Sequence, residues 1–268
     1  MSGGKSLLKE LEQRGRKALI TGASKGIGLA CSAALAEEGC DVILVSRNGA
    51  DLEKAAQHIR SKSNVSVTWH ATDLSSSTAV TELTTAYPDI DILVNNAGAI
   101  PGGSIDAVDE ARWRHAWDLK VFGYINMTRA YLALMRPRRS GVIINMLGLA
   151  GEKPDSAYIA GSAGNASLMA FTRALGGTSP ADNIRVVGIN PGPVLTERLE
   201  TLLRNKARVS HGDESRWEEF LEPLPFGRAA HVEEVAAMTA FLASDRASYI
   251  SGTIVTIDGG AANRGAVF

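Results

Sequence analysis

The sequence predicts a three-layer α/β fold with a doubly wound parallel sheet of about seven strands. Short β-branched runs alternate with longer amphipathic or alanine-rich segments along nearly the whole chain, a rhythm typical of right-handed crossovers between parallel strands. Several of these runs are apolar at consecutive positions, as strands covered on both faces should be. A glycine-rich segment joins the first strand to the first long helix.

The expected elements follow this alternation in order. The strand candidates share a β-branched or aliphatic run and are Lys17–Thr21, Asp41–Ser46, Val65–His70, Ile90–Asn95, Gly141–Met146, Ile184–Asn190 and Thr253–Ile257. The helix candidates between them are Gly26–Glu38, Gly49–Ser61, Ser75–Tyr87, Asp109–Met135, a segment near Ser162–Leu175, and Val232–Ala243. Residues 195–226 break the rhythm because they are charged and aromatic. We expect them to form a helical lid over a ligand crevice.

Composition sets the class of protein. A chain of 268 residues with 45% hydrophobic residues can build one large core. It shows no internal repeat and no linker-like shift, so we expect one domain over residues 1–268. Twenty-eight basic and 29 acidic residues give a net charge of −1, which offers no support for nucleic-acid binding or a polybasic membrane anchor.

Cysteine and histidine usage argues against disulfides and metals. Two cysteines are too few for a disulfide framework, no C-x-x-C pair is present, and the five histidines lie far apart. The first 16 residues hold no apolar signal-like run, and no segment is apolar enough to span a membrane. We therefore expect a cytoplasmic protein with no metal site and no membrane contact.

The glycine-rich segment after the first strand predicts a nucleotide site. Gly22 permits a tight turn, Gly26 lets the backbone approach a pyrophosphate, and Gly28 allows close packing of helix on strand. The N-terminus of the following helix then offers unpaired N–H groups to the phosphates. This strand, loop and helix order is that of a Rossmann-type dinucleotide site.

The G-x-x-x-G-x-G spacing resembles the short-chain dehydrogenase/reductase family, and the likeness runs from Lys17 to Gly260. It includes the segments Asp73-Leu74, Asn95–Gly98, Asn190–Thr196 and Ser251–Gly260. The resemblance implies that the second and third of these reach the ribose and the nicotinamide carboxamide, and that the first flanks the adenine. The implied cofactor-binding residues are Gly22, Ser24, Lys25, Gly26, Ile27, Gly28, Ser46, Arg47, Asp73, Leu74, Asn96, Ala97, Gly98, Pro191, Gly192, Val194 and Thr196.

The residues after the second strand bear on the choice of cofactor. A carboxylate there would bind the ribose hydroxyls of NAD and repel a 2′-phosphate. This chain has Ser46-Arg47-Asn48 instead. Arg47 offers a planar donor fork to a phosphate, and Lys25 adds a second positive charge. We expect NADP(H) to be favoured over NAD(H); the alternative is that both residues are solvated surface cations.

The catalytic positions depart from the family pattern. In the family a Tyr transfers the proton, a Lys four residues later lowers its pKa, a Ser orients the carbonyl, and an Asn supports a water. In an ungapped match these positions fall on Gly161, Asn165, Gly148 and Lys120, in that order. A competing register takes Tyr158 as the catalytic Tyr, but it places Ser162 at the Lys position and breaks the match further along the helix.

Three interpretations remain open. The first is an NADP(H)-dependent oxidoreductase of a small carbonyl or alcohol substrate, with relocated catalytic residues Lys120 and Tyr158. Tyr158 would then swing into the volume left at Gly161. The second is an NADP(H)-binding sensor or partner subunit without hydride transfer, and the third is an enzyme of another class. The resemblance favours the first. Lys120 has the alternative of extending along its helix to solvent.

The resemblance also implies an assembly. Family members usually associate through two long helices, here Asp109–Met135 and Gly161–Leu175, and through the last strand. We therefore expect a homotetramer or a homodimer.

Overall fold

The computed structural model describes residues 13–76 and 78–264. Its seven strands form one parallel sheet in the order β3-β2-β1-β4-β5-β6-β7, which confirms the predicted fold class. The strands are β1 (Lys17–Thr21), β2 (Asp41–Ser46), β3 (Val67–Ala71), β4 (Ile92–Asn95), β5 (Gly141–Met146), β6 (Ile184–Pro191) and β7 (Ile254–Ile257). Every residue of the interior strand β5 is buried, whereas the edge strand β3 starts two residues later than predicted and is largely exposed.

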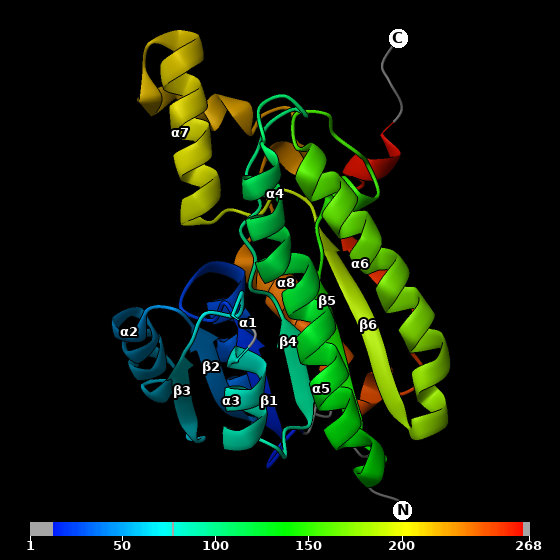
Figure 1. Cartoon of the computed structure of the whole chain (residues 1–268). Coiled ribbons are helices and arrows are strands. Elements are labelled where there is room, and N and C mark those ends of the chain that lie inside the picture. The colour runs from blue at the N-terminus through cyan, green and yellow to red at the C-terminus, as the bar shows by residue number, and fades with distance from the viewer. Residues whose placement is uncertain (1–12, 77, 265–268) are drawn as a thin grey trace, which may run out of the picture.

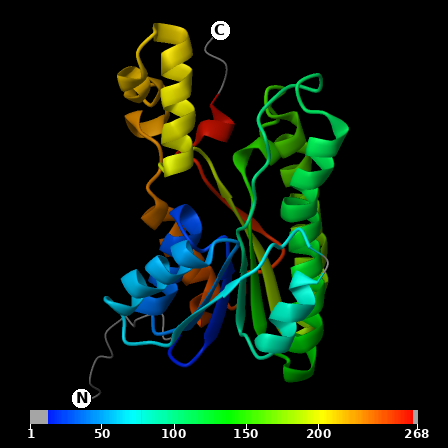
Figure 2. The ribbon, with the colours of Figure 1, turned by 60° about the vertical axis from the view of Figure 1, so that its left-hand side comes forward.

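Helices cover both faces of the sheet (Figures 1 and 2). One face carries α1 (Gly26–Glu37), α2 (Gly49–Arg60) and α8 (Val232–Ala243), whose buried side chains join one hydrophobic cluster. The other face carries α3 (Ala79–Ala86), α5 (Gly123–Arg138) and α6 (Ile159–Thr178). Burial of apolar side chains on both sides of parallel strands explains why the strands are apolar at consecutive positions.

The predicted helix Asp109–Met135 is wrong as a single element. The structure divides it into α4 (Glu110–Trp117), a π-helical turn at Asp118–Phe122, and α5. The N–H of Gly123 donates to the carbonyl of Asp118, five residues back. The extra residue in the turn shifts the helical face, so Lys120 lies buried within it. An amphipathic pattern does not reveal an insertion of one residue.

The segment predicted to form a lid is helical. It consists of α7 (Glu197–His211) and a 3₁₀ segment, Glu214–Phe220, and it stands beyond the carboxyl ends of the strands, drawn in yellow and gold in Figure 1. Ala207 is the one described residue of α7 that is fully buried. Within residues 13–76 and 78–264, no helix combines the length and the apolar character that crossing a bilayer requires.

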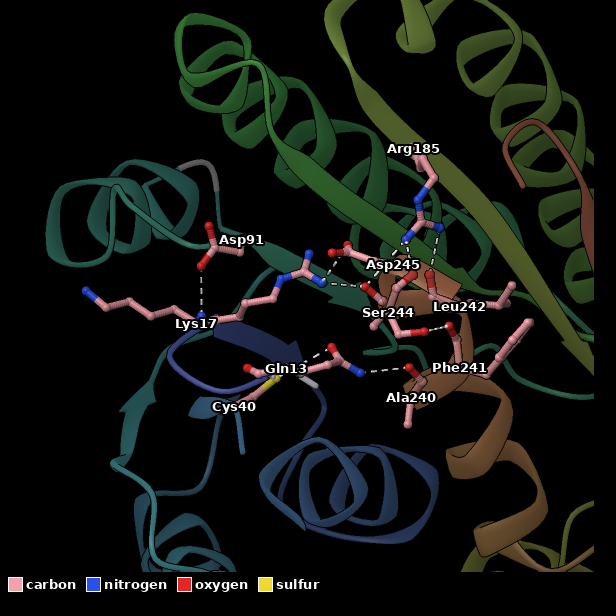
Figure 3. A network of polar contacts seen from close by, with 12 residues as sticks. Gln13, Lys17, Cys40, Asp91, Arg185, Ala240, Phe241, Leu242, Ser244 and Asp245 are labelled. Carbon is pink, nitrogen blue, oxygen red and sulfur yellow. Dashed lines mark hydrogen bonds and ion pairs between the residues drawn. The ribbon is translucent and has the colours of Figure 1, made fainter. Parts of the chain in front are cut away.

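The amino ends of the strands carry a polar network around the end of α8 (Figure 3). Arg185 donates to the carbonyls of Leu242 at 2.7 Å and Ser244 at 3.0 Å. Arg16 donates to the carbonyl of Ala243 at 2.7 Å. Leu242 and Ala243 lie in the last turn of α8, where carbonyls lack an N–H partner within the helix, and Ser244 is the residue that follows it. The two cations donate to these carbonyls at the negative end of the helix dipole, and Ser244 also accepts from the N–H of Ala247 at 3.2 Å. The network holds the end of α8 against the amino ends of the strands. The candidate functional site lies at the opposite end of the sheet, beyond the carboxyl ends of the strands.

Candidate functional site

A cleft of about 890 Å³ runs along the carboxyl ends of the strands. It lies where the strand order reverses between β1 and β4, which is the usual ligand position in open α/β sheets. Its walls come from the glycine segment after β1, from the loops after β2, β3, β4, β5 and β6, from the π-helical turn, and from the first turns of α7.

Nearly all of the residues implied as cofactor-binding line this cleft. Those that do are Gly22, Ser24, Lys25, Gly26, Ile27, Ser46, Arg47, Leu74, Asn96, Ala97, Gly98, Pro191, Gly192, Val194 and Thr196. Gly28 and Asp73 lie outside the lining. A Cβ at Gly28 would overlap the carbonyl of Gly22, so this glycine serves the close packing of α1. Asp73 accepts hydrogen bonds from the N–H and hydroxyl of Ser75.

The geometry of the glycine segment fits a dinucleotide. Gly22 and Gly26 have φ of +67° and +57°, the left-handed region that favours glycine. A Cβ at Gly22 would lie 2.9 Å from Nδ2 of Asn96. Across the cleft, Asn165 is 3% exposed, and its Oδ1 is buried with no hydrogen-bond partner in the part of the chain that the structure describes. A buried acceptor of this kind suits a ribose hydroxyl donor.

The two cations near the phosphate end differ. Lys25 forms an ion pair of 3.2 Å with Glu197 of α7. Both side chains are exposed, so the pair contributes little to stability. Within the described chain, Arg47 has no carboxylate at ion-pair distance. The N–H of Ser75 is the main group that lowers the pKa of Asp73, and the positive charge of Arg47 adds to this effect. Arg47 is the cation left free for a ligand.

Lys120 is buried in the wall of the cleft, with 8% of the residue exposed. Its Nζ donates to the carbonyl of Met146 at 2.7 Å and to the hydroxyl of Tyr124 at 3.1 Å. The Tyr124 hydroxyl donates to the same carbonyl at 3.0 Å. The alternative in which Lys120 extends to solvent is therefore wrong. Two directions of the tetrahedral nitrogen are occupied, and the third has no partner among the described residues.

Burial changes the acidity of Lys120. Loss of hydration lowers the pKa of its ammonium to about 7, and the positive charge of Arg198 acts in the same direction. The stem of Lys120 lies against Gly98, where a Cβ would approach the Lys120 Cδ to 2.5 Å. A glycine at position 98 is therefore what lets the lysine occupy this wall.

The ring of Tyr158 fills the space beside Gly161. A Cβ at Gly161 would overlap Cε1 and Cζ of that ring. Any side chain at position 161 and the observed position of the Tyr158 ring thus exclude each other. Tyr158 lines the cleft, and its hydroxyl has no partner in the described part of the chain. Burial raises the pKa of Tyr158 and Arg198 opposes this, so the phenol stays protonated near neutral pH.

The remaining two positions lie together. A Cβ at Gly148 would come within 3.0 Å of Nδ2 of Asn165, and this Nδ2 donates to the carbonyl of Gly161 at 2.9 Å. The structure thus places Lys120, Gly148, Asn165 and Tyr158 in the lining of one cleft. Gly161 is not part of this lining and packs against the ring of Tyr158.

Sequence reasoning missed two residues of this site. Tyr124 is fully buried and holds Lys120; its spacing of four residues on a helix was the available signal. Arg198 follows Thr196 by two residues, and its Nη2 donates to the carbonyl of Ile100 at 2.9 Å. Over residues 13–76 and 78–264, no group of three or more His, Cys, Asp and Glu side chains is placed to hold a metal ion.

Comparison with known proteins places the chain in a family. A family model described as enoyl-(acyl carrier protein) reductase matches residues 22–262. The 3-oxoacyl-(acyl-carrier-protein) reductase of Chlamydia trachomatis is 32% identical over 92% of this chain and 97% of its own.

Solved structures agree. The L-sorbose reductase of Gluconobacter frateurii, complexed with NADPH and L-sorbose, is 31% identical with a TM-score of 0.88, over 96% of this chain and all of its own. A structure described as a short chain dehydrogenase/reductase family protein is 32% identical with a TM-score of 0.82, over 94% of this chain and all of its own. The chain belongs to the short-chain dehydrogenase/reductase family.

Proposed function

We propose that the protein is an NADP(H)-dependent oxidoreductase that interconverts a carbonyl and an alcohol, with Lys120 as the group that transfers the proton. The observation that carries this proposal is the Lys120 amine in the wall of the cleft, which donates to two acceptors and has no third among the described residues. Membership of an oxidoreductase family supports it, as does the solved relative complexed with NADPH and L-sorbose.

The hydrogen bonds of Lys120 define what its nitrogen can do. Two N–H groups point to Met146 O and Tyr124 Oη in either protonation state. The remaining direction holds an N–H when the amine is protonated and a lone pair when it is neutral. With a pKa of about 7, both states are populated near neutral pH. This is the condition for efficient general acid and base catalysis.

A bound nicotinamide dinucleotide supplies or accepts the hydride. In the direction of reduction, Lys120 donates its third proton to the substrate oxygen as negative charge develops there. In the direction of oxidation, the neutral amine takes the hydroxyl proton. The ammonium also stabilises the oxyanion electrostatically, because its site is largely shielded from water. Lys120 thus replaces the proton-transfer role of the family's tyrosine.

Tyr158 acts as an orienting donor in this proposal. Its pKa is raised by burial, so it remains a neutral phenol with a hydroxyl to donate. Its ring is fixed against Gly161. A hydrogen bond from Tyr158 to the substrate oxygen would hold that oxygen near the amine of Lys120, while Asn165 offers its unpartnered Oδ1 to the cofactor ribose.

The preference for NADP(H) rests on Arg47. It lines the cleft after β2, where the chain has no carboxylate, and it lacks an acidic partner among the described residues. The hydroxyls of Ser24 and Ser46 lie 3.3 Å apart in the same lining and add donors for a 2′-phosphate. A guanidinium fork and two hydroxyls match the shape of a phosphate.

The proposal also includes a homotetramer or homodimer in the cytoplasm, as members of the family commonly form. Light scattering at working concentration tests the assembly, and a strictly monomeric mass would contradict it.

The test combines binding with turnover. Titration of the purified protein should show tighter binding of NADPH than of NADH, with Arg47→Ala weakening NADPH alone by about tenfold or more. A screen of carbonyl compounds should then find substrates that oxidise NADPH. Equal affinities for both dinucleotides in both proteins would overturn the cofactor assignment. Tight NADPH binding without turnover of any compound would overturn the enzymatic role.

A further inference from the structure

Arg198 separates two clefts. It stands in the first turn of α7 and reaches the carbonyl of Ile100, in the loop after β4. Beside the main cleft lies a smaller one of about 320 Å³. The two share Ala99, Ile100 and Arg198. We call the smaller cleft the basic annex; its lining is Ala99, Ile100, Pro101, Arg112, His115, Ala116 and Arg198.

The cations of the basic annex differ from their neighbours. On α4, Arg114 pairs with Glu110 at 2.8 Å, and on α7, Arg204 pairs with Glu200 at 2.7 Å. By contrast, Arg112 donates to the carbonyl of Ala107 and Arg198 to that of Ile100. Neither has a carboxylate at ion-pair distance among the described residues. The two arginines that line the annex therefore have backbone carbonyls and no carboxylates as partners within the described residues, whereas Arg208, farther along α7, donates to the amide Oδ1 of Asn205.

We propose that the basic annex binds an anionic group, a carboxylate or a phosphate, of the same substrate whose carbonyl reacts beside Lys120. The proposal rests on the proposed function. Because Arg198 lines both clefts, a molecule with its carbonyl in the main cleft would place a charged end against Arg198 and Arg112. A planar guanidinium pairs with carboxylate or phosphate through two parallel hydrogen bonds.

The position of Arg198 couples the two ends of such a substrate. Its positive charge reaches both Lys120 and Tyr158, and it lowers the pKa of each. The lining of the annex contains Arg112, His115 and Arg198 and no acidic residue. A substrate anion would balance this charge.

The annex is distinct from the phosphate-binding end of the main cleft. Its lining contains no residue of the glycine segment 22–28 and does not include Arg47. The anion is therefore assigned to the substrate and not to the dinucleotide.

The first experiment uses inorganic phosphate as the probe. Calorimetric titration at constant ionic strength, on protein saturated with NADPH, should show phosphate binding to the wild type. Arg198→Met should weaken that binding at least about tenfold, whereas Arg208→Met, at an exposed position of the same helix, should leave it unchanged. No binding by the wild type, or equal binding by all three proteins, would overturn the annex. Phosphate binding that appears only without NADPH would assign the anion to the cofactor and overturn the proposal.

The second experiment tests whether the anion belongs to a carbonyl compound. Levulinate, a keto acid, should compete with phosphate, whereas its uncharged methyl ester should not. Equal competition by both, or by neither, would contradict the proposal. These readouts measure binding alone. A failure of the proposed function, with no NADPH oxidation by any compound, would leave a positive phosphate result standing, and a failure of the annex would leave turnover intact.

Discussion

The cations at the two ends of the sheet differ in their hydrogen bonding and in their pKa. At the amino end, Arg185 is half-buried, and its guanidinium is spent on the carbonyls that end α8 (Figure 3). At the carboxyl end, Lys120 is more deeply buried, yet its amine has two acceptors and one open direction. Burial lowers the pKa of Arg185 to about 10 and that of Lys120 to about 7. With these values the arginine stays charged at neutral pH, whereas the charged and neutral forms of the lysine are both populated.

This difference shows what decides whether a buried cation has a structural role or a role in proton transfer. A cation that donates to carbonyls at the end of a helix and keeps a high pKa stabilises the fold and stays charged at neutral pH. A donor held on two sides, whose pKa lies near the ambient pH, can transfer a proton in the third direction. At the carboxyl end, the Oδ1 of Asn165 lines the cleft and is buried with no hydrogen-bond partner among the described residues. A buried acceptor beside a cleft is a place where a ligand donor can complete the polar contacts.

The largest expected effect comes from removing the amine. Lys120→Met keeps the length of the stem against Gly98 but deletes the proton-transfer group, so kcat should fall by at least about 10²-fold. Steady-state kinetics with a substrate from the screen measures this. NADPH affinity, measured by fluorescence titration, should stay within a few-fold. A variant with full activity would exclude Lys120 from the chemistry.

At the opposite end, loss of the cation should affect stability alone. Arg185→Leu leaves the carbonyl of Leu242 without the arginine donor and the carbonyl of Ser244 with the N–H of Ala247 alone, so it should lower the free energy of unfolding by about 1.5–3 kcal/mol. Urea denaturation measures this loss. Arg129→Leu, at an exposed position of α5, is the control and should change stability by less than about 0.5 kcal/mol. A drop in kcat for Arg185→Leu, with its stability unchanged, would erase the contrast between the two ends.

The packing of Tyr158 on Gly161 gives a third test. Gly161→Ala would force the new methyl into the tyrosine ring, so it should cost about 1–3 kcal/mol of stability and displace the ring from the cleft. Gly177→Ala is the matched control, because position 177 is in the same helix and has open space around it. It should be neutral or stabilising by up to about 1 kcal/mol. Thermal unfolding of both variants measures the difference; equal melting temperatures would contradict this packing.

The smallest effect is on the pH dependence of stability. The pKa of Lys120 in the folded chain, about 7, lies below its ordinary value of 10.5. Between these values the unfolded chain holds more protons than the folded one, so this lysine makes stability rise with pH. From pH 7 to 8 the gain should be about 1 kcal/mol. Urea denaturation of the wild type and of Lys120→Met at both pH values isolates this contribution. Parallel pH dependence in the two proteins would contradict the lowered pKa.

The fold was predictable because its signals are local and repeated. Each strand carries its own apolar run, and the glycine segment marks the first crossover, so the sheet followed from the sequence. The environment of Lys120 was not predictable, since it depends on a π-helical turn and on contacts with Met146 and Tyr124 from two elements. The sequence predicted that Tyr158 could occupy the volume left by the missing side chain at Gly161. It did not predict the orientation of the tyrosine ring. Arg198 lies in a segment rich in charged residues. The pattern of this segment does not indicate which of its side chains face the cleft.

The most direct test of Lys120 as the proton-transfer group is an NMR titration of its own side chain. Lysines labelled with ¹⁵N and ¹³C at the ζ and ε positions are followed from pH 5 to 11, and Lys120→Met assigns the resonance by its loss. We predict one lysine that titrates with a pKa of about 7, well below the others. If the Lys120 resonance titrates with the remaining lysines, near about 10.4, the amine is a fixed cation, and it is not the group that moves the proton.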